Sequence, residues 1–135
     1  MKLITRDTDY ALRAICSMVK NKDRVVSVPE LVAELKIPGP FLRKILQVLN
    51  KKHIVRSLKG NGGGFTLDMR PEKIFLLDVA RIFQGTIKLN ECTLSKKRCP
   101  LIKACALSSK INNIEKDVIR QLRGISVALL IKQKV

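Results

Sequence analysis

The strongest constraint on the fold is the run Ile37-Pro38-Gly39-Pro40, which separates two short amphipathic segments. A capping box at Ser27-Val28-Pro29-Glu30, with proline in its first turn, predicts a helix that ends near Lys36. Proline cannot occupy a helix interior but can open a helix, so a second helix should cover residues 41–50. Two short helices joined by a tight turn have the outline of a helix-turn-helix.

The helix over residues 41–50 has an apolar and a polar face, and we call it the reading helix. Helical spacing predicts that its buried side chains are Phe41, Leu42, Ile45, Leu46 and Leu49. The same spacing leaves Arg43, Lys44 and Gln47 outside.

A β-hairpin is predicted directly after the reading helix. Residues 54–58 and 65–67 have the composition of strands, and the Lys59-Gly60-Asn61-Gly62-Gly63-Gly64 run between them accepts positive φ angles. A helix-turn-helix followed by a hairpin is a winged helix, in which the hairpin is the wing. The expected fold class is therefore mainly α with a small β-hairpin wing, completed by a long dimerisation helix.

Helices are also expected on both sides of this unit. Thr5 can cap a first helix that runs to about Val19, and a short helix should cover residues 76–83. Gly124 and Ser126 are predicted to end a longer helix and to cap a last short one.

The longer helix carries an apolar stripe at coiled-coil-like spacing. Its residues are Ile111, Ile114, Val118 and Leu122. We predict that this stripe pairs two copies of the chain in a homodimer, with packing on its own domain as the alternative. The chain then divides into a winged helix-turn-helix DNA-binding domain at 1–85, a cysteine-bearing cluster loop at 86–108, and the dimerisation helix with a short C-terminal helix at 109–135.

The charge of the chain indicates a polyanionic partner. Lys and Arg number 27 against 11 Asp and Glu, a formal net charge of +16 at pH 7. Between residues 35 and 67 there is no acidic residue, and the basic residues there are Lys36, Arg43, Lys44, Lys51, Lys52, Arg56 and Lys59. Aromatic residues make up only 4% of the chain, which disfavours single-strand binding by stacking, so duplex DNA is the expected partner. A merely solvated surface is the alternative.

Membrane proteins and enzymes are disfavoured by the same sequence. No apolar run is long enough to span a membrane, and the N-terminal residues 1–7 lack the apolar core of a signal peptide. We therefore expect a soluble, cytoplasmic protein without membrane contact. The lone His53 has no placed nucleophile partner, and no phosphate-binding glycine loop opens a helix, so an enzyme is not expected.

Cys92, Cys99 and Cys105 lie within fourteen residues among basic side chains. Cationic neighbours favour thiolates and offset the negative charge of a thiolate-ligated cluster. Zinc is a weaker choice because its usual tight cysteine pairs are absent and the only histidine is distant. We therefore predict an iron–sulfur cluster, with unligated or redox-active cysteines as the alternative. Cys16 lies on the apolar face of the first helix and is expected to be a small core residue.

Over nearly its whole length the chain resembles the Rrf2 (Rrf-two) family of winged-helix regulators. The resemblance is carried by the Thr8-Asp9-Tyr10-Ala11-Leu12-Arg13-Ala14 run, the reading helix from Leu42 to Leu49, the wing sequence from Lys59 to Phe65, and the three cysteines. It implies a dimeric transcription regulator with the reading helix in the major groove and the wing at the minor groove. It also implies that a bound iron–sulfur cluster tunes DNA affinity.

In this resemblance Cys92, Cys99 and Cys105 match three cluster thiolates. In the IscR branch the fourth ligand is a histidine three residues after the last cysteine, where this chain has Ser108. In the NsrR branch it is an aspartate of the other subunit, and Asp9 stands at the matching place. We therefore predict Asp9 as the fourth ligand, with a 4Fe-4S cluster favoured and a 2Fe-2S cluster as the alternative. A first-turn carboxylate that stabilises the helix dipole is the alternative role of Asp9.

The predicted DNA contacts lie on the reading helix and the wing. Arg43 has the reach to pair with guanine O6 and N7, Gln47 suits adenine or a phosphate, and Lys44 suits a phosphate. The complete set of predicted DNA-binding residues is Arg43, Lys44, Gln47, Lys51, Arg56, Lys59, Gly60 and Asn61.

The sequence thus predicts a transcription regulator whose affinity for a double-stranded operator is set by an iron–sulfur cluster that senses nitric oxide, oxygen, redox state or cluster supply. One alternative is a regulator that uses its thiols directly as a redox switch, without a cluster. Another, from a different class, is an iron–sulfur electron-transfer or cluster-carrier protein whose basic surface docks an acidic partner. Salt-sensitive and sequence-selective duplex binding distinguishes the regulators from the carrier.

Overall fold

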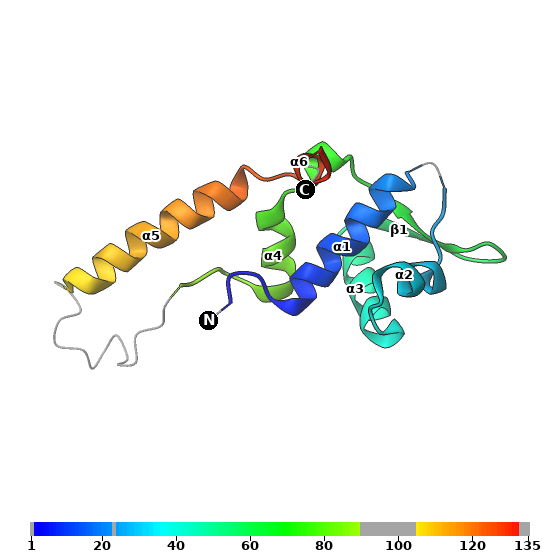
Figure 1. The fold of residues 1–135 in the computed structure, drawn as a ribbon, viewed down its shortest axis with the longest axis horizontal. Helices are drawn as coiled ribbons and strands as arrows, with labels where there is room; N and C mark the ends of the chain where they lie inside the picture. Colours follow the sequence, from blue (N-terminus) through cyan, green and yellow to red (C-terminus); the bar gives the residue numbers. More distant parts are fainter. Residues whose placement is uncertain (1, 23, 90–104, 133–135) are drawn as a thin grey trace.

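The computed structural model describes residues 2–22, 24–89 and 105–132 of the chain. It is mostly helical with one two-stranded antiparallel hairpin, which confirms the predicted fold class (Figure 1). The elements are α1 (Arg6–Lys20), α2 (Val28–Leu35), α3 (Gly39–Lys51), β1 (Val55–Leu58), β2 (Gly64–Leu67), the 3-10 helix η1 (Pro71–Lys73), α4 (Leu76–Gln84), α5 (Ala106–Arg123) and α6 (Val127–Lys132). Among the described residues, no helix is both long and apolar enough to cross a membrane.

The first helices begin at the predicted caps. The Thr5 hydroxyl accepts a hydrogen bond from the Thr8 amide at 3.4 Å, and the Ser27 hydroxyl accepts one from the Glu30 amide at 3.3 Å. The reading helix, α3, begins at Gly39, two residues earlier than predicted. The reason is that Pro40 lies inside its first turn, where a missing amide hydrogen costs nothing.

The main core forms where α1 packs against α2, α3, α4 and the hairpin. From α3 it takes the buried side chains Leu42, Ile45, Leu46 and Leu49, as predicted. Phe41 was expected in this core, and that prediction is wrong, because its side chain is 43% exposed. One residue corresponds to about 100° around a helix, so Phe41 lies on the flank of α3 and not on its buried face.

The hairpin is antiparallel, with Val55 opposite Leu67 and Leu58 opposite Gly64. Its second strand is also bridged to the connection between α1 and α2, through Val26 and Phe65. At Gly64 this bridge leaves no room for a side chain, because a Cβ would collide with the Val26 carbonyl group. The root of the wing is thus packed directly on the helix-turn-helix.

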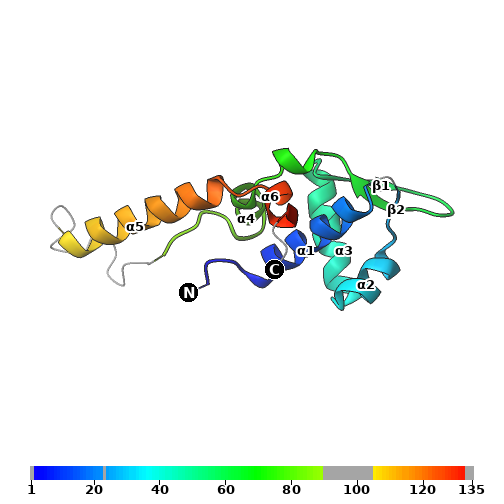
Figure 2. The same ribbon diagram turned by 45° about the horizontal axis from the view of Figure 1, so that its top comes forward.

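A second, smaller core joins α4 to the end of α5. Its buried residues are Leu76, Leu77, Ala80, Ile87 and Leu122. From this contact α5 extends away from the rest of the molecule, as Figures 1 and 2 show. Gly124 ends α5, and the Ser126 hydroxyl accepts a hydrogen bond from the Leu129 amide at 3.2 Å at the start of α6, as predicted.

Candidate nucleic-acid interface

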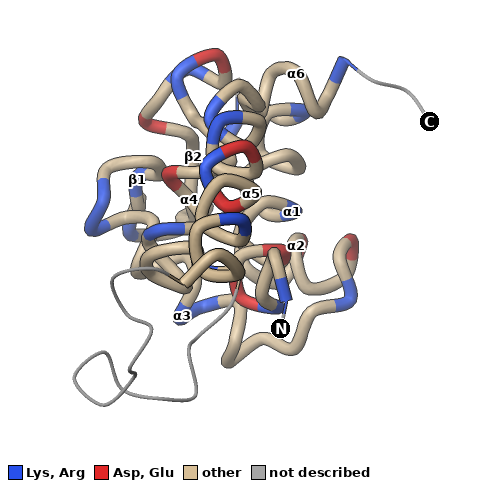
Figure 3. Tube along the Cα trace, turned by 90° about the vertical axis from the view of Figure 1, so that its left-hand side faces the viewer, with Lys and Arg blue, Asp and Glu red and all other residues tan. Residues whose placement is uncertain are grey.

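The polar face of α3 is exposed and carries three basic residues. Arg43, Lys44, Gln47 and Lys51 are all exposed, on the side opposite the buried leucines. Figure 3 shows lysine and arginine along α3 and on the hairpin. The structure therefore brings together the predicted members of the reading helix.

The hairpin lies beside this face and is tied to it. The Ser57 amide of β1 donates a hydrogen bond to the Asn50 side-chain oxygen of α3 at 3.3 Å. Arg56, Lys59, Gly60 and Asn61 are exposed along β1 and the tip of the hairpin. All eight predicted DNA-binding residues thus lie on the exposed surface of one structural unit.

A hollow of about 370 Å³ opens on the other flank of α3. Its lining residues are Asp7, Lys44, Ile45, Gln47, Val48, Lys51 and Phe83. Arg6 lies nearby, with its guanidinium carbon 4.9 Å from the centre of the Phe41 ring. The sequence analysis missed this part of the surface because three helices form it, and no periodic pattern marks Arg6 or Phe83.

Cys92 and Cys99 lie outside the described residues, so Cys105 is the one predicted cluster thiol that the structure places. Cys105 is half-buried at the N-terminal cap of α5, where its Sγ accepts a hydrogen bond from the Ser108 amide at 3.4 Å. Asp9 lies in the first turn of α1 and accepts a hydrogen bond from Arg13 at 2.9 Å. Within one chain Cys105 stands at the end of α5 remote from α1 (Figure 1), so the structure does not bring it together with Asp9.

The described residues contain no group of three or more metal-ligating side chains. The fit of an iron–sulfur cluster therefore depends on the chemistry of the donor set. Three thiolates are the ligands that such clusters use, and Cys105 is a free, half-buried cysteine. Cys16 is different, because it packs against the main core, and burial raises the pKa of its thiol more than nearby Lys20 lowers it.

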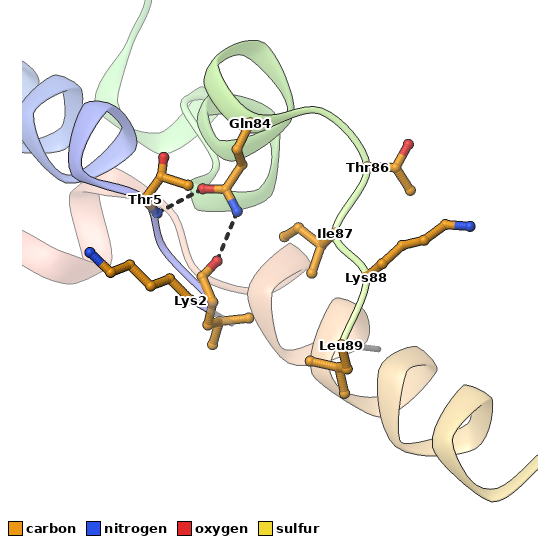
Figure 4. A pocket seen from close by; sticks show the side chains of 8 residues that line it. Lys2, Thr5, Gln84, Thr86, Ile87, Lys88 and Leu89 are labelled. Carbon is orange, nitrogen blue, oxygen red and sulfur yellow. Dashed lines mark hydrogen bonds between the residues drawn. The ribbon is translucent and has the colours of Figure 1, made fainter. Parts of the chain in front are cut away.

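The segment that leads to the cysteines is held by Gln84 at the end of α4 (Figure 4). The Gln84 side-chain oxygen accepts hydrogen bonds from the Thr5 amide at 3.0 Å and the Thr8 hydroxyl at 2.8 Å, and its nitrogen donates to the Leu3 carbonyl at 2.9 Å. Further along, the Leu89 amide donates to the Glu115 carboxylate of α5 at 3.1 Å. These bonds connect the start of the cysteine segment to both α1 and α5.

A winged helix whose reading helix and hairpin carry basic and no acidic residues indicates a DNA-binding protein. Comparison with known proteins identifies the family: residues 4–133 match the Rrf2 family, described as iron-dependent transcriptional regulators, and the chain belongs to it. It is thus a DNA-binding transcriptional regulator and not an enzyme.

Relatives of this chain carry regulator names. An HTH-type transcriptional regulator of Aquifex aeolicus (strain VF5) is 33% identical over 124 residues, which cover 90% of this chain and 86% of the relative. The HTH-type transcriptional regulator NsrR of Bacillus licheniformis is 32% identical over 114 residues, which cover 83% of this chain and 79% of NsrR.

Solved structures share the fold at lower identity. A transcriptional regulator from Listeria innocua matches with a TM-score of 0.81 at 23% identity, over 100% of this chain and 89% of that chain. The oxidised form of Staphylococcus aureus CymR matches with a TM-score of 0.80 at 19% identity, over 100% of this chain and 99% of the CymR chain. The T. potens IscR structure matches with a TM-score of 0.76 at 21% identity, over 98% and 87%.

Proposed function

We propose that this regulator binds an operator as a homodimer, with α3 in the major groove and the hairpin against the minor groove. The observation that carries this proposal is the basic surface of α3 and the hairpin, which belongs to a chain window without any acidic residue. Paired recognition helices fit half-sites about one helical turn apart, 34–36 Å along the duplex.

The exposed part of α5 supports the homodimer. Leu107 is 67% exposed and Ile114 is 51% exposed, while Ile111 is half-buried. Apolar side chains at such positions are stabilised by a second copy of the same helix. Val118 and Leu122, which were predicted on the same stripe, pack against their own chain at the base of α5, so they support the helix from within the subunit.

We further propose that Cys92, Cys99 and Cys105 hold an iron–sulfur cluster, completed by Asp9 of the other subunit. The relative named NsrR, the family description and the thiolate set support this proposal. Bound in this way, the group would supply redox and ligand-exchange chemistry that a protein without it lacks. Residues 84–89 would carry the state of this site to the winged helix, because hydrogen bonds join Gln84 to Thr5 and Thr8 at the start of α1 and Leu89 to Glu115 of α5.

The first experiment is anaerobic purification followed by absorption spectroscopy and assays of iron and acid-labile sulfide. We expect a broad band near 400 nm, typical of thiolate-bound clusters, and an altered or lost band in Asp9→Ala. Asp7→Ala is the matched control, because it removes a carboxylate from the same first turn of α1. Equal effects of both substitutions would exclude Asp9 as a ligand.

Duplex binding by the purified and the iron-depleted protein then separates the alternatives. A difference in operator affinity between the two forms supports cluster control. Equal affinity, together with loss of binding on thiol oxidation, would establish the thiol switch instead. Weak binding that ignores sequence would favour a carrier protein, since a specific duplex reader prefers its site strongly.

A further inference from the structure

The contact between Arg6 and Phe41 is not explained by the core or by the reading face. Phe41 is a large apolar side chain left 43% exposed in the first turn of α3. The Arg6 guanidinium lies over its ring at 4.9 Å and is 6.0 Å from the ring of Tyr10. Distances of this size are those of cation–π pairs, in which the ring orients the guanidinium.

This pair occupies a defined side of the reading helix. Phe41 and Asn50 are nine residues apart, about two and a half turns, so their side chains lie on opposite flanks of α3. Asn50 holds the hairpin through the Ser57 amide. The basic face of α3 therefore lies between the hairpin on one flank and Arg6 on the other.

A helix inserted into the major groove has a phosphate backbone on each side. We infer that Arg6, oriented by Phe41, contacts a DNA phosphate on the side of the reading helix opposite the wing. This inference rests on the proposed docking of α3 in the major groove. Guanidinium pairs with phosphate through two parallel hydrogen bonds and stays charged at every physiological pH.

The surroundings of Arg6 agree with this role. Its side chain is 59% exposed, and its ion pair with Asp7 is long, 3.7 Å from Nε to Oδ1. Such an exposed pair contributes little, so a phosphate can replace Asp7 as the partner of the guanidinium. Stacking on Phe41 also restricts the long arginine side chain before DNA arrives, which lowers the entropy lost on binding.

The test measures binding of the full chain to two duplexes, a site selected from a random-sequence library and a scrambled duplex of the same length, over a series of salt concentrations. Arg6→Ala should weaken binding to both duplexes by the same factor. It should also make the negative slope of the logarithm of the association constant against the logarithm of the salt concentration shallower by about one. Arg120→Ala is the matched control, because Arg120 is also an exposed arginine, at 75% against 59% for Arg6, and pairs with Asp117 on α5, away from the reading face. It should leave both affinity and slope unchanged.

A double-mutant cycle tests the part played by the ring. Phe41→Leu should reproduce part of the Arg6→Ala loss, and the effect of Arg6→Ala should shrink in the Phe41→Leu background. An undiminished effect there would refute orientation by Phe41. Unchanged affinity and slope in Arg6→Ala, with normal binding by the wild type, would overturn the phosphate contact alone. Absence of any sequence preference in the wild type would overturn the proposed docking of α3.

Discussion

Arg43 and Lys51 lie on the same exposed face of α3, but at different ends of it. In a docked helix-turn-helix the N-terminal residues of the recognition helix contact base edges, while later positions approach the sugar–phosphate backbone. Two basic side chains of one face can therefore have different functions. Arg43 also has a planar guanidinium group whose paired N–H donors match guanine O6 and N7, whereas a lysine ammonium group does not.

Replacement of Arg43 by alanine should reduce the preference for one base pair of the operator, at a cost of about 1–3 kcal/mol. Lys51→Ala should weaken selected and scrambled duplexes alike, because a phosphate contact carries no base information. Competition binding with single-base variants of the selected site measures both effects. An equal loss on all duplexes for Arg43→Ala would show that Arg43 does not read a base.

Loss of the Gln84 side chain should destabilise the folded chain itself. In Gln84→Ala the Thr5 amide and the Thr8 hydroxyl lose their acceptor, and Thr8 is fully buried. The Thr8 hydroxyl then keeps only its 3.1 Å hydrogen bond with the Thr5 hydroxyl. Loss of the Gln84 hydrogen bonds should lower the free energy of unfolding by about 1–3 kcal/mol. Urea denaturation measures the change, and Gln121→Ala, an exposed glutamine of α5, is the control that should leave it unaltered.

At the scale of elements, the sequence predicted where the helices begin and end far better than which side chains of different helices are in contact. Ser27 and Thr5 determine where α2 and α1 begin because their hydroxyl groups cap amides only three residues away. The positions of Phe41, Arg6 and Gln84 depend on helices that are distant in sequence, so local patterns could not reveal them. For the same reason the stripe predicted from helical spacing includes Leu122, which packs against α4 within the chain.

The cap of α2 also predicts a pH response. The hydrogen bond from Arg24 to Glu30, at 2.7 Å, is the main reason that the pKa of Glu30 lies below its ordinary value, with smaller help from the Arg24 charge and from Ser27. A carboxyl group with a lowered pKa in the folded state stabilises that state above its ordinary pKa. This contribution is lost as the pH falls through the lowered value.

Glu30→Gln should therefore flatten the acid side of the curve of melting temperature against pH, while stability near neutral pH falls slightly. Arg24→Ala should produce the same flattening, because it removes the partner that lowers the pKa. The double variant should add nothing further. An unchanged acid side in both single variants would show that this pair does not contribute to the pH dependence.

At the scale of the whole molecule, α5 has two distinct parts. Its base is packed on α4 through Leu122, which is 6% exposed, whereas the opposite part carries exposed Leu107 and Ile114. Most of this 18-residue helix thus lies outside the core of its own chain. The extended shape in Figures 1 and 2 is what a subunit with a projecting pairing helix would show.

Two substitutions should separate these parts. Leu122→Ala should lower the free energy of unfolding by about 2–5 kcal/mol through the cavity it leaves. Ile114→Ala should raise the dimer dissociation constant about tenfold, which corresponds to about 1.4 kcal/mol. Sedimentation over a range of concentrations and denaturation at one fixed concentration distinguish the two effects. A monomeric wild type at all concentrations would refute the pairing role of α5.

The close approach of Gly64 to Val26 has a consequence for how such a regulator can change over generations. No larger residue fits at Gly64, at the root of the hairpin. At Gly60 and Gly62, near the tip, a Cβ would meet nothing within 4 Å, although the positive φ angles there still favour glycine. The exposed tip residues Lys59 and Asn61 are under no such steric limit. In the proposed docking, new operator preferences can therefore arise by substitution at the tip, while the root preserves the alignment of the hairpin with the helix-turn-helix.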